Sequence, residues 1–170
     1  MSPFSFGSPG GNPMRVGVNR GASGIDGTLA TAVEYAKGTS VPVTVVLGDI
    51  ALLHDLNSLV LLAKSALPIT AVVINNNGGG IFSFLPVAEC EEYMDRYFLA
   101  RHNLQFRAAA EFAGLKYTNP KSKTSFTTAY RECLAAHIPA LIEVNTNSED
   151  NVQIHREIEA AIVSALEGPD

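Results

Sequence analysis

The sequence predicts an α/β fold of three layers, in which a mostly parallel sheet has helices on both faces. Three apolar segments rich in β-branched residues carry this prediction: Val41–Leu47, Ile69–Ile74 and Ala140–Val144. Runs without polar alternation are typical of strands that are buried on both faces. Segments with helical periodicity separate these runs, and strands that alternate with helices along a chain form parallel sheets. The 170 residues suffice for one ordinary domain.

The first two strands and the segment between them predict a βαβ unit. Asp55–Ala66 lies between the strands, and apolar residues recur there at helical spacing. Further helices are expected at Gly27–Lys37, Gln105–Ala113, Ser125–Ala136 and Asp150–Leu166, and short strands at Val16–Val18 and Leu115–Tyr117. Residues 1–15 are rich in Ser, Pro and Gly, so we expect a flexible lead-in there and one domain over residues 16–170.

Composition excludes several classes of function. The net charge is −5 and no basic run occurs, so binding to nucleic acid by charge neutralisation is not expected. The apolar runs are far shorter than the roughly 20 residues of a membrane span. Cys90 and Cys133 form no paired motif, which argues against a disulfide framework and a cysteine zinc site. The N-terminus has no signal-peptide pattern, so we do not expect a secreted protein.

Three polar segments follow predicted strands: Asn19–Asp26, Gly48–Asp49 and Asn75–Gly80. Open parallel sheets bind ligands beyond the carboxyl ends of their strands. A carboxylate, an amide oxygen and a loop carbonyl are hard ligands that suit Mg²⁺, and glycines let a backbone approach a phosphate closely. Each segment by itself is also typical of an ordinary turn. Together they predict a Mg²⁺–diphosphate site at one edge of the sheet.

The spacing of the last two segments resembles a known fingerprint. Asp49 and Asn75 are 26 residues apart, and the Gly-Asp…Asn-Asn pattern is similar to that of thiamine diphosphate-dependent enzymes. The stretches NRGASGIDGTLATA, GDIALLHDLNSLVLL and INNNGGGIFSFLP resemble the C-terminal diphosphate-binding domain of that family. They are most similar to its menaquinone and phylloquinone branch. The resemblance extends from Val16 to the C-terminus and is weaker after Phe106.

The resemblance implies a role for individual residues in cofactor binding. Asp49, Asn76 and the backbone carbonyl of Gly78 would hold Mg²⁺ or Mn²⁺. Ile25 would be the apolar wedge that bends thiamine diphosphate, although at the start of a helix it also suits the core. The diphosphate would be lined by Gly48, Ile50, Ala51, Gly79 and Gly80.

The resemblance also implies residues that face the substrate. Arg20 would bind a substrate carboxylate, for which a guanidinium is suited, although a surface ion pair is the ordinary role of such a residue. Ile81, Phe82 and Leu85 would wall the active-site cavity, although their spacing also suits an amphipathic turn. His102 matches a family position near a helix start, and a structural role is favoured for it.

The implied enzyme is a transferase that decarboxylates 2-oxoglutarate and adds the succinyl semialdehyde unit to isochorismate. A different carboligase, similar to acetolactate synthase, and a non-catalytic binding module that retains the fold are the alternatives. Enzymes of this family take an activating glutamate from a separate pyrimidine-binding domain on another subunit of a dimer or tetramer. We therefore expect a fragment that is inactive alone. Its location would be the cytoplasm in a bacterium and the plastid in an alga or plant.

Overall fold

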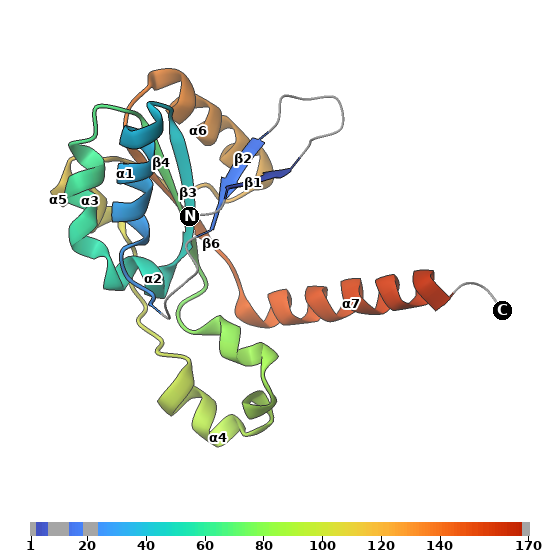
Figure 1. The fold of residues 1–170 in the computed structure, drawn as a ribbon. Coiled ribbons are helices and arrows are strands. Elements are labelled where there is room, and N and C mark those ends of the chain that lie inside the picture. The colour runs from blue at the N-terminus through green and yellow to red at the C-terminus, as the bar shows by residue number, and fades with distance from the viewer. Residues whose placement is uncertain (1–2, 7–13, 19–23, 168–170) are drawn as a thin grey trace.

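The core of the fold is a parallel sheet in the order β3-β4-β6-β5 (Figure 1). The structure, a computed structural model, describes residues 3–6, 14–18 and 24–167. The strands of this sheet are β3 (Val43–Gly48), β4 (Ile69–Asn75), β5 (Lys116–Thr118) and β6 (Ala140–Asn145). All three pairings within the sheet are parallel. The predicted strands are confirmed, and their apolar runs bury β4 and most of β6. The burial on both faces predicted for Val41–Leu47 is wrong, because β3 lies at the edge of the sheet and Val46 is exposed.

Helices cover both faces of the sheet, which confirms the predicted three layers (Figure 1). One face is covered by α1 (Thr28–Thr39), α2 (Asp49–His54), α3 (Leu59–Ala63) and α5 (Arg107–Ala113). Their apolar side chains pack with those of the sheet, and the larger members are Leu29, Leu52, Leu59, Leu62, Ile69, Phe106 and Leu141. The other face packs against α6 (Lys123–Ala136), whose Cys133 is buried against Val72 and Ile142.

The single helix expected over Asp55–Ala66 is replaced by a 3₁₀ turn at Leu56–Ser58 and the short helix α3, and α2 ends just before this range at His54. Asp55 is buried, and its carboxylate accepts hydrogen bonds from the Leu29 amide at 2.6 Å and from the Ser58 hydroxyl. The break in the helix therefore places a carboxylate at the otherwise unpaired N–H groups of α1. Helical periodicity alone does not reveal such a long-range bond, which spans 26 residues.

The N-terminal segment forms a separate antiparallel pair of strands. Strand β1 (Pro3–Phe6) pairs with β2 (Met14–Gly17), with Phe4 opposite Val16. The structure thus has a strand inside the segment expected as a flexible lead-in. The strand expected at Val16–Val18 begins earlier and does not join the main sheet. The β-branched and aromatic residues Phe4, Phe6 and Val16 favour strands in this segment.

Two segments extend from the edge of the sheet at which α2 begins (Figure 1). The first holds 3₁₀ turns at Gly80–Phe84 and Pro86–Glu89, α4 (Glu91–Tyr93) and a π-helical turn at Met94–Phe98. The second is α7 (Ser148–Glu167), which is exposed along most of its length. Among the helices that the structure describes, none has the length and apolar character needed to cross a bilayer.

Candidate functional site

The carboxyl ends of β3 and β4 bring the predicted metal ligands together. Gly48, the last residue of β3, lies opposite Ile74 in the parallel register, so Asp49 and the loop after Asn75 start side by side. Asp49 is buried, with only 2% of its surface exposed. The backbone N–H of Gly78 donates to Oδ2 of Asp49 at 2.9 Å. Two segments that are 29 residues apart in sequence therefore form one compact site.

Three oxygens converge in this site. The side-chain amide of Asn76 points its oxygen at Oδ2 of Asp49, at 3.3 Å, and at the carbonyl oxygen of Gly78, at 2.6 Å. Oxygens at these distances repel one another unless a donor or a cation lies among them. A half-turn of the amide would supply N–H donors, and a cation would satisfy all three oxygens as they stand. A carboxylate, an amide oxygen and a backbone carbonyl fit Mg²⁺.

The Asp49 carboxylate is fixed by donors on both of its oxygens. Oδ1 accepts from the N–H of Ile50 at 2.8 Å, while Oδ2 receives Gly78 N–H and also lies 3.0 Å from Nε2 of His102. The His102 side chain is itself nearly buried. A carboxylate with this many partners has little freedom to rotate, which suits a metal ligand. The contact with His102 was not predicted, because 53 residues separate the two side chains.

The glycine loop needs its glycines for close packing. Gly78 has φ +134°, and a Cβ there would lie 2.0 Å from the carbonyl oxygen of Leu99. A Cβ on Gly79 would lie 2.5 Å from the carbonyl oxygen of Phe98. The N–H of Gly79 donates to Leu99, and that of Gly80 donates to Gly78. The loop thus packs closely against the backbone of residues 98–99. That Gly79 and Gly80 contact a diphosphate stays a prediction.

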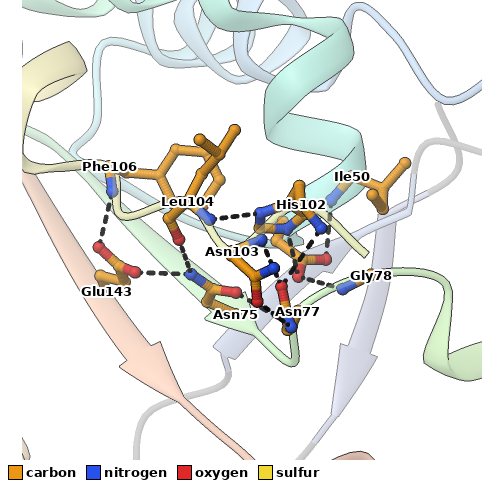
Figure 2. A network of polar contacts seen from close by, with 10 residues as sticks. Ile50, Asn75, Asn77, Gly78, His102, Asn103, Leu104, Phe106 and Glu143 are labelled. Atoms are coloured by element: carbon orange, nitrogen blue, oxygen red, sulfur yellow. Dashed lines mark hydrogen bonds and ion pairs between the residues drawn. The ribbon is translucent and has the colours of Figure 1, made fainter. Parts of the chain in front are cut away.

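A polar network joins the asparagine run to the segment 102–106 (Figure 2). Oδ1 of Asn77 accepts from the backbone N–H groups of His102 and Asn103, at 3.3 and 2.7 Å. Nδ2 of Asn75 donates to the Leu104 carbonyl at 3.0 Å and to Oε1 of Glu143 at 2.7 Å. The asparagines therefore hold a distant segment of the chain against the ends of the strands.

Glu143 anchors this network and was missed by the sequence reasoning. It is fully buried on β6, and its Oε2 accepts from the Phe106 N–H at 2.9 Å and the Tyr117 hydroxyl at 2.7 Å. A lone glutamate in the apolar run ALIEV was the signal that could have found it. Burial and the hydrogen bond to Glu143 raise the pKa of Tyr117 above its ordinary value. Because the folded state holds this proton more tightly, the pair stabilises the fold below about pH 10 and loses that contribution at higher pH.

We expect Glu143→Gln to destabilise the protein. A neutral amide in this place would turn an N–H group toward at least one of the three donors that the carboxylate satisfies. A buried donor left unpaired costs about 1–3 kcal/mol of the free energy of unfolding, which urea titration measures. Glu132→Gln is the matched control, since Glu132 is exposed and its carboxylate lies 3.6 Å from Nζ of Lys116. Equal stabilities of the two variants would contradict the role given to Glu143.

The remaining predicted site residues differ in exposure, and one of them lies outside the described residues. Ile25 is 44% exposed, and Ile81 and Leu85 are 71% and 47% exposed. Phe82 is partly buried and its ring packs 5.3 Å from that of Phe98. Gly48, Ile50 and Ala51 flank Asp49 at the junction of β3 and α2. Arg20 lies outside the described residues.

An apolar groove of about 560 Å³ lies elsewhere, between the α2–α3 region and α5. Its lining includes Leu53, Leu59 and Phe112 but none of the predicted site residues. The candidate site at the strand ends is thus separate from this groove. The apolar side chains of Ile25, Ile81 and Leu85 are exposed, so they are accessible to a ligand or to another domain.

Comparison with known proteins identifies the family of the chain. Residues 14–144 match the profile of the thiamine pyrophosphate enzyme family, C-terminal TPP binding domain. The 2-succinyl-5-enolpyruvyl-6-hydroxy-3-cyclohexene-1-carboxylate (SEPHCHC) synthase of Rubrobacter xylanophilus is 51% identical over 91% of this chain and 26% of its own length. The synthase of the same name from Salinibacter ruber is 45% identical over 94% of this chain and 27% of its own. The chain thus spans about a quarter of the length of these relatives.

Solved structures of the family share the fold. The thiamine diphosphate-dependent 4-hydroxybenzoylformate decarboxylase of Rhodococcus jostii RHA1 superposes with a TM-score of 0.62 and 26% identity, over 71% of this chain and 23% of that one. Benzoylformate decarboxylase of Polynucleobacter necessarius has a TM-score of 0.60 over the same shares at 23% identity, which shows the fold alone. The chain belongs to the thiamine pyrophosphate enzyme family, and residues 14–144 correspond to its C-terminal, thiamine pyrophosphate-binding domain.

Proposed function

We propose that this chain is the thiamine diphosphate- and Mg²⁺-binding part of a SEPHCHC synthase. The observation that carries the proposal is that the Asp49 carboxylate, the Asn76 side-chain amide and the Gly78 backbone meet at the ends of β3 and β4. The names and high identity of the relatives support the reaction, in which 2-oxoglutarate loses carbon dioxide and its succinyl semialdehyde unit is added to isochorismate in menaquinone biosynthesis. The relatives are bacterial, and we place the protein in the cytoplasm as part of the proposal.

The residues divide between cofactor and substrate. Thiamine diphosphate, when bound, supplies the stabilisation of negative charge that the decarboxylation requires. In the proposed site Asp49, Asn76 and the Gly78 carbonyl hold the metal, and Ile25 is the apolar wedge beneath the cofactor. The diphosphate is lined by Gly48, Ile50, Ala51, Gly79 and Gly80.

The substrate side of the proposed site consists of apolar side chains and one positively charged arginine. The guanidinium of Arg20 suits a carboxylate of the substrate, since it donates two parallel hydrogen bonds. Ile81, Phe82 and Leu85 form a wall that keeps water away from the reacting carbon. The exposure of Ile81 and Leu85 supports this role, because a wall residue has to remain accessible until the substrate is bound.

The proposal includes a second domain besides residues 16–170. The relatives are about four times as long as the matched region, which supports the view that residues 16–170 are one domain of a larger enzyme. A pyrimidine-binding domain on another subunit would provide the activating glutamate, within a dimer or tetramer. The exposed apolar residues Ile25 and Ile81 are suited to a cleft shared with that domain.

The cofactor part of the proposal is tested by calorimetric titration of the chain with thiamine diphosphate. We expect binding in the presence of Mg²⁺ and its loss when EDTA removes the metal, because the diphosphate needs a cation between itself and Asp49. The titration is repeated with a pyrimidine-binding domain from a relative. Absence of binding in both arrangements would exclude the enzyme proposal and favour a non-catalytic module with the same fold.

The reaction is tested by product analysis of the chain combined with that pyrimidine-binding domain. We expect product from 2-oxoglutarate with isochorismate and none from pyruvate. The reverse result would assign the chain to a carboligase similar to acetolactate synthase.

A further inference from the structure

We propose that His102 is a positioning residue for Asp49, holding the carboxylate in the orientation that a metal requires. The proposal rests on the metal site described above and deepens it. The distance between Nε2 of His102 and Oδ2 of Asp49 is 3.0 Å, and both side chains are more than nine-tenths buried. A buried contact of this length between an imidazole nitrogen and a carboxylate oxygen is a hydrogen bond of good geometry.

The second ring nitrogen determines which way this hydrogen bond runs. Nδ1 of His102 lies 2.9 Å from the backbone N of Leu104. A backbone amide can only donate, so Nδ1 is the acceptor and carries no proton. The neutral ring therefore carries its proton on Nε2 and donates it to Asp49. The Leu104 amide thus selects the tautomer of His102 that can support the carboxylate.

The same tautomer argues against His102 as a metal ligand itself. A ring nitrogen binds a metal through its lone pair. As long as Nδ1 accepts from Leu104, Nε2 carries the hydrogen and has no lone pair available for a metal. His102 is therefore outside the ligand set of Asp49, Asn76 and Gly78. As a neutral donor, it also leaves the negative charge of Asp49 available to the metal, which a cationic partner would partly neutralise.

The surrounding network explains why His102 is fixed in place. Its backbone N–H donates to Asn77, and the next residues are held by Asn75 and Asn77. Its ring lies 6.1 Å from the ring of Phe106, which is buried in the core. The loop that follows the metal ligand Asn76 along the chain thus also fixes the partner of Asp49. Partners of this kind commonly change metal affinity by about 10- to 100-fold when they are removed.

The test compares four forms of the 170-residue chain: wild type, His102→Phe, His102→Gln and His155→Phe. Mn²⁺, added with thiamine diphosphate, is the probe, and electron paramagnetic resonance measures the free ion. His102→Phe keeps a ring against Phe106 but has no donor, so we expect its dissociation constant for Mn²⁺ to rise about 10-fold or more. His102→Gln places an amide N–H within reach of Asp49 and should recover most of that loss. His155 is exposed on α7 and serves as the matched control, for which no change is expected.

A second measurement tests the tautomer in the metal-free chain. Long-range ¹H–¹⁵N spectra should show His102 with an unprotonated Nδ1 and a protonated Nε2. A protonated Nδ1, or wild-type Mn²⁺ affinity in folded His102→Phe, would overturn the inference while leaving the metal site intact. Failure of the wild-type chain to bind Mn²⁺ in any form would instead refute the proposed function, and the inference with it. If His102→Phe does not fold, the Mn²⁺ affinity of His102→Gln and the nitrogen spectrum decide. An Mn²⁺ affinity of His102→Gln far below that of the wild type then overturns the inference.

Discussion

Asp49→Asn is expected to abolish the metal-dependent binding of thiamine diphosphate. Asp49 is the one anionic member of the proposed ligand set, and the variant removes its charge with almost no change in shape. A close pair of unit charges near a protein surface is worth about 4 kcal/mol, and about 1.4 kcal/mol corresponds to a tenfold change in affinity. We therefore expect a loss of at least about 100-fold in calorimetric titration with Mg²⁺ and thiamine diphosphate.

Asp55→Asn is the control for this experiment, because Asp55 is a buried carboxylate six residues later that lies outside the site. It accepts from the Leu29 amide and the Ser58 hydroxyl at the start of α1. Its replacement should reduce the free energy of unfolding by about 1–3 kcal/mol and leave cofactor affinity in the folded protein unchanged. If both variants retain wild-type affinity, Asp49 is not a metal ligand.

The contrast between these two aspartates shows what the sequence can predict. Asp49 follows the edge strand β3, and the parallel register places the carboxyl end of that strand beside the loop after Asn75. A local pattern plus one topological rule was enough to bring the two segments together. The role of Asp55 depends instead on a hydrogen bond to a helix 26 residues earlier, so periodicity predicted an unbroken helix where the chain turns.

The same limit applies to the support of the site. His102 lies 53 residues from Asp49, and Glu143 lies 68 residues from Asn75. Neither forms a motif with its partner, and a segment such as RHNLQF has no regular period that would place it at the strand ends. The ligands of a site can thus be predicted where they terminate regular elements, while the groups that orient those ligands come from irregular segments fixed by tertiary packing.

Gly78→Ala is expected to cause the second large effect, on stability. Gly78 has φ +134°, which an L-residue rarely adopts, and an added Cβ would lie 2.0 Å from the carbonyl oxygen of Leu99. The clash is with backbone, so no side-chain rotation relieves it. Overpacking and backbone strain each cost about 1–3 kcal/mol, so we expect the free energy of unfolding to fall by about 2–6 kcal/mol in urea titration.

Alanine variants of two other glycines serve as controls, which separate the cost of the steric clash from the cost of the backbone strain. Gly114→Ala also places a side chain at positive φ, +76°, but with no atom within 4 Å of the new Cβ, so it should cost only about 1–2 kcal/mol. Gly38, near the end of α1, has open space around it, and Gly38→Ala should stabilise the protein by up to about 1 kcal/mol. A loss at Gly78 no larger than that at Gly114 would mean that Leu99 can move away. Such movement would shift the chain that leads to His102, so the folded Gly78→Ala protein should then bind Mn²⁺ more weakly than Gly114→Ala.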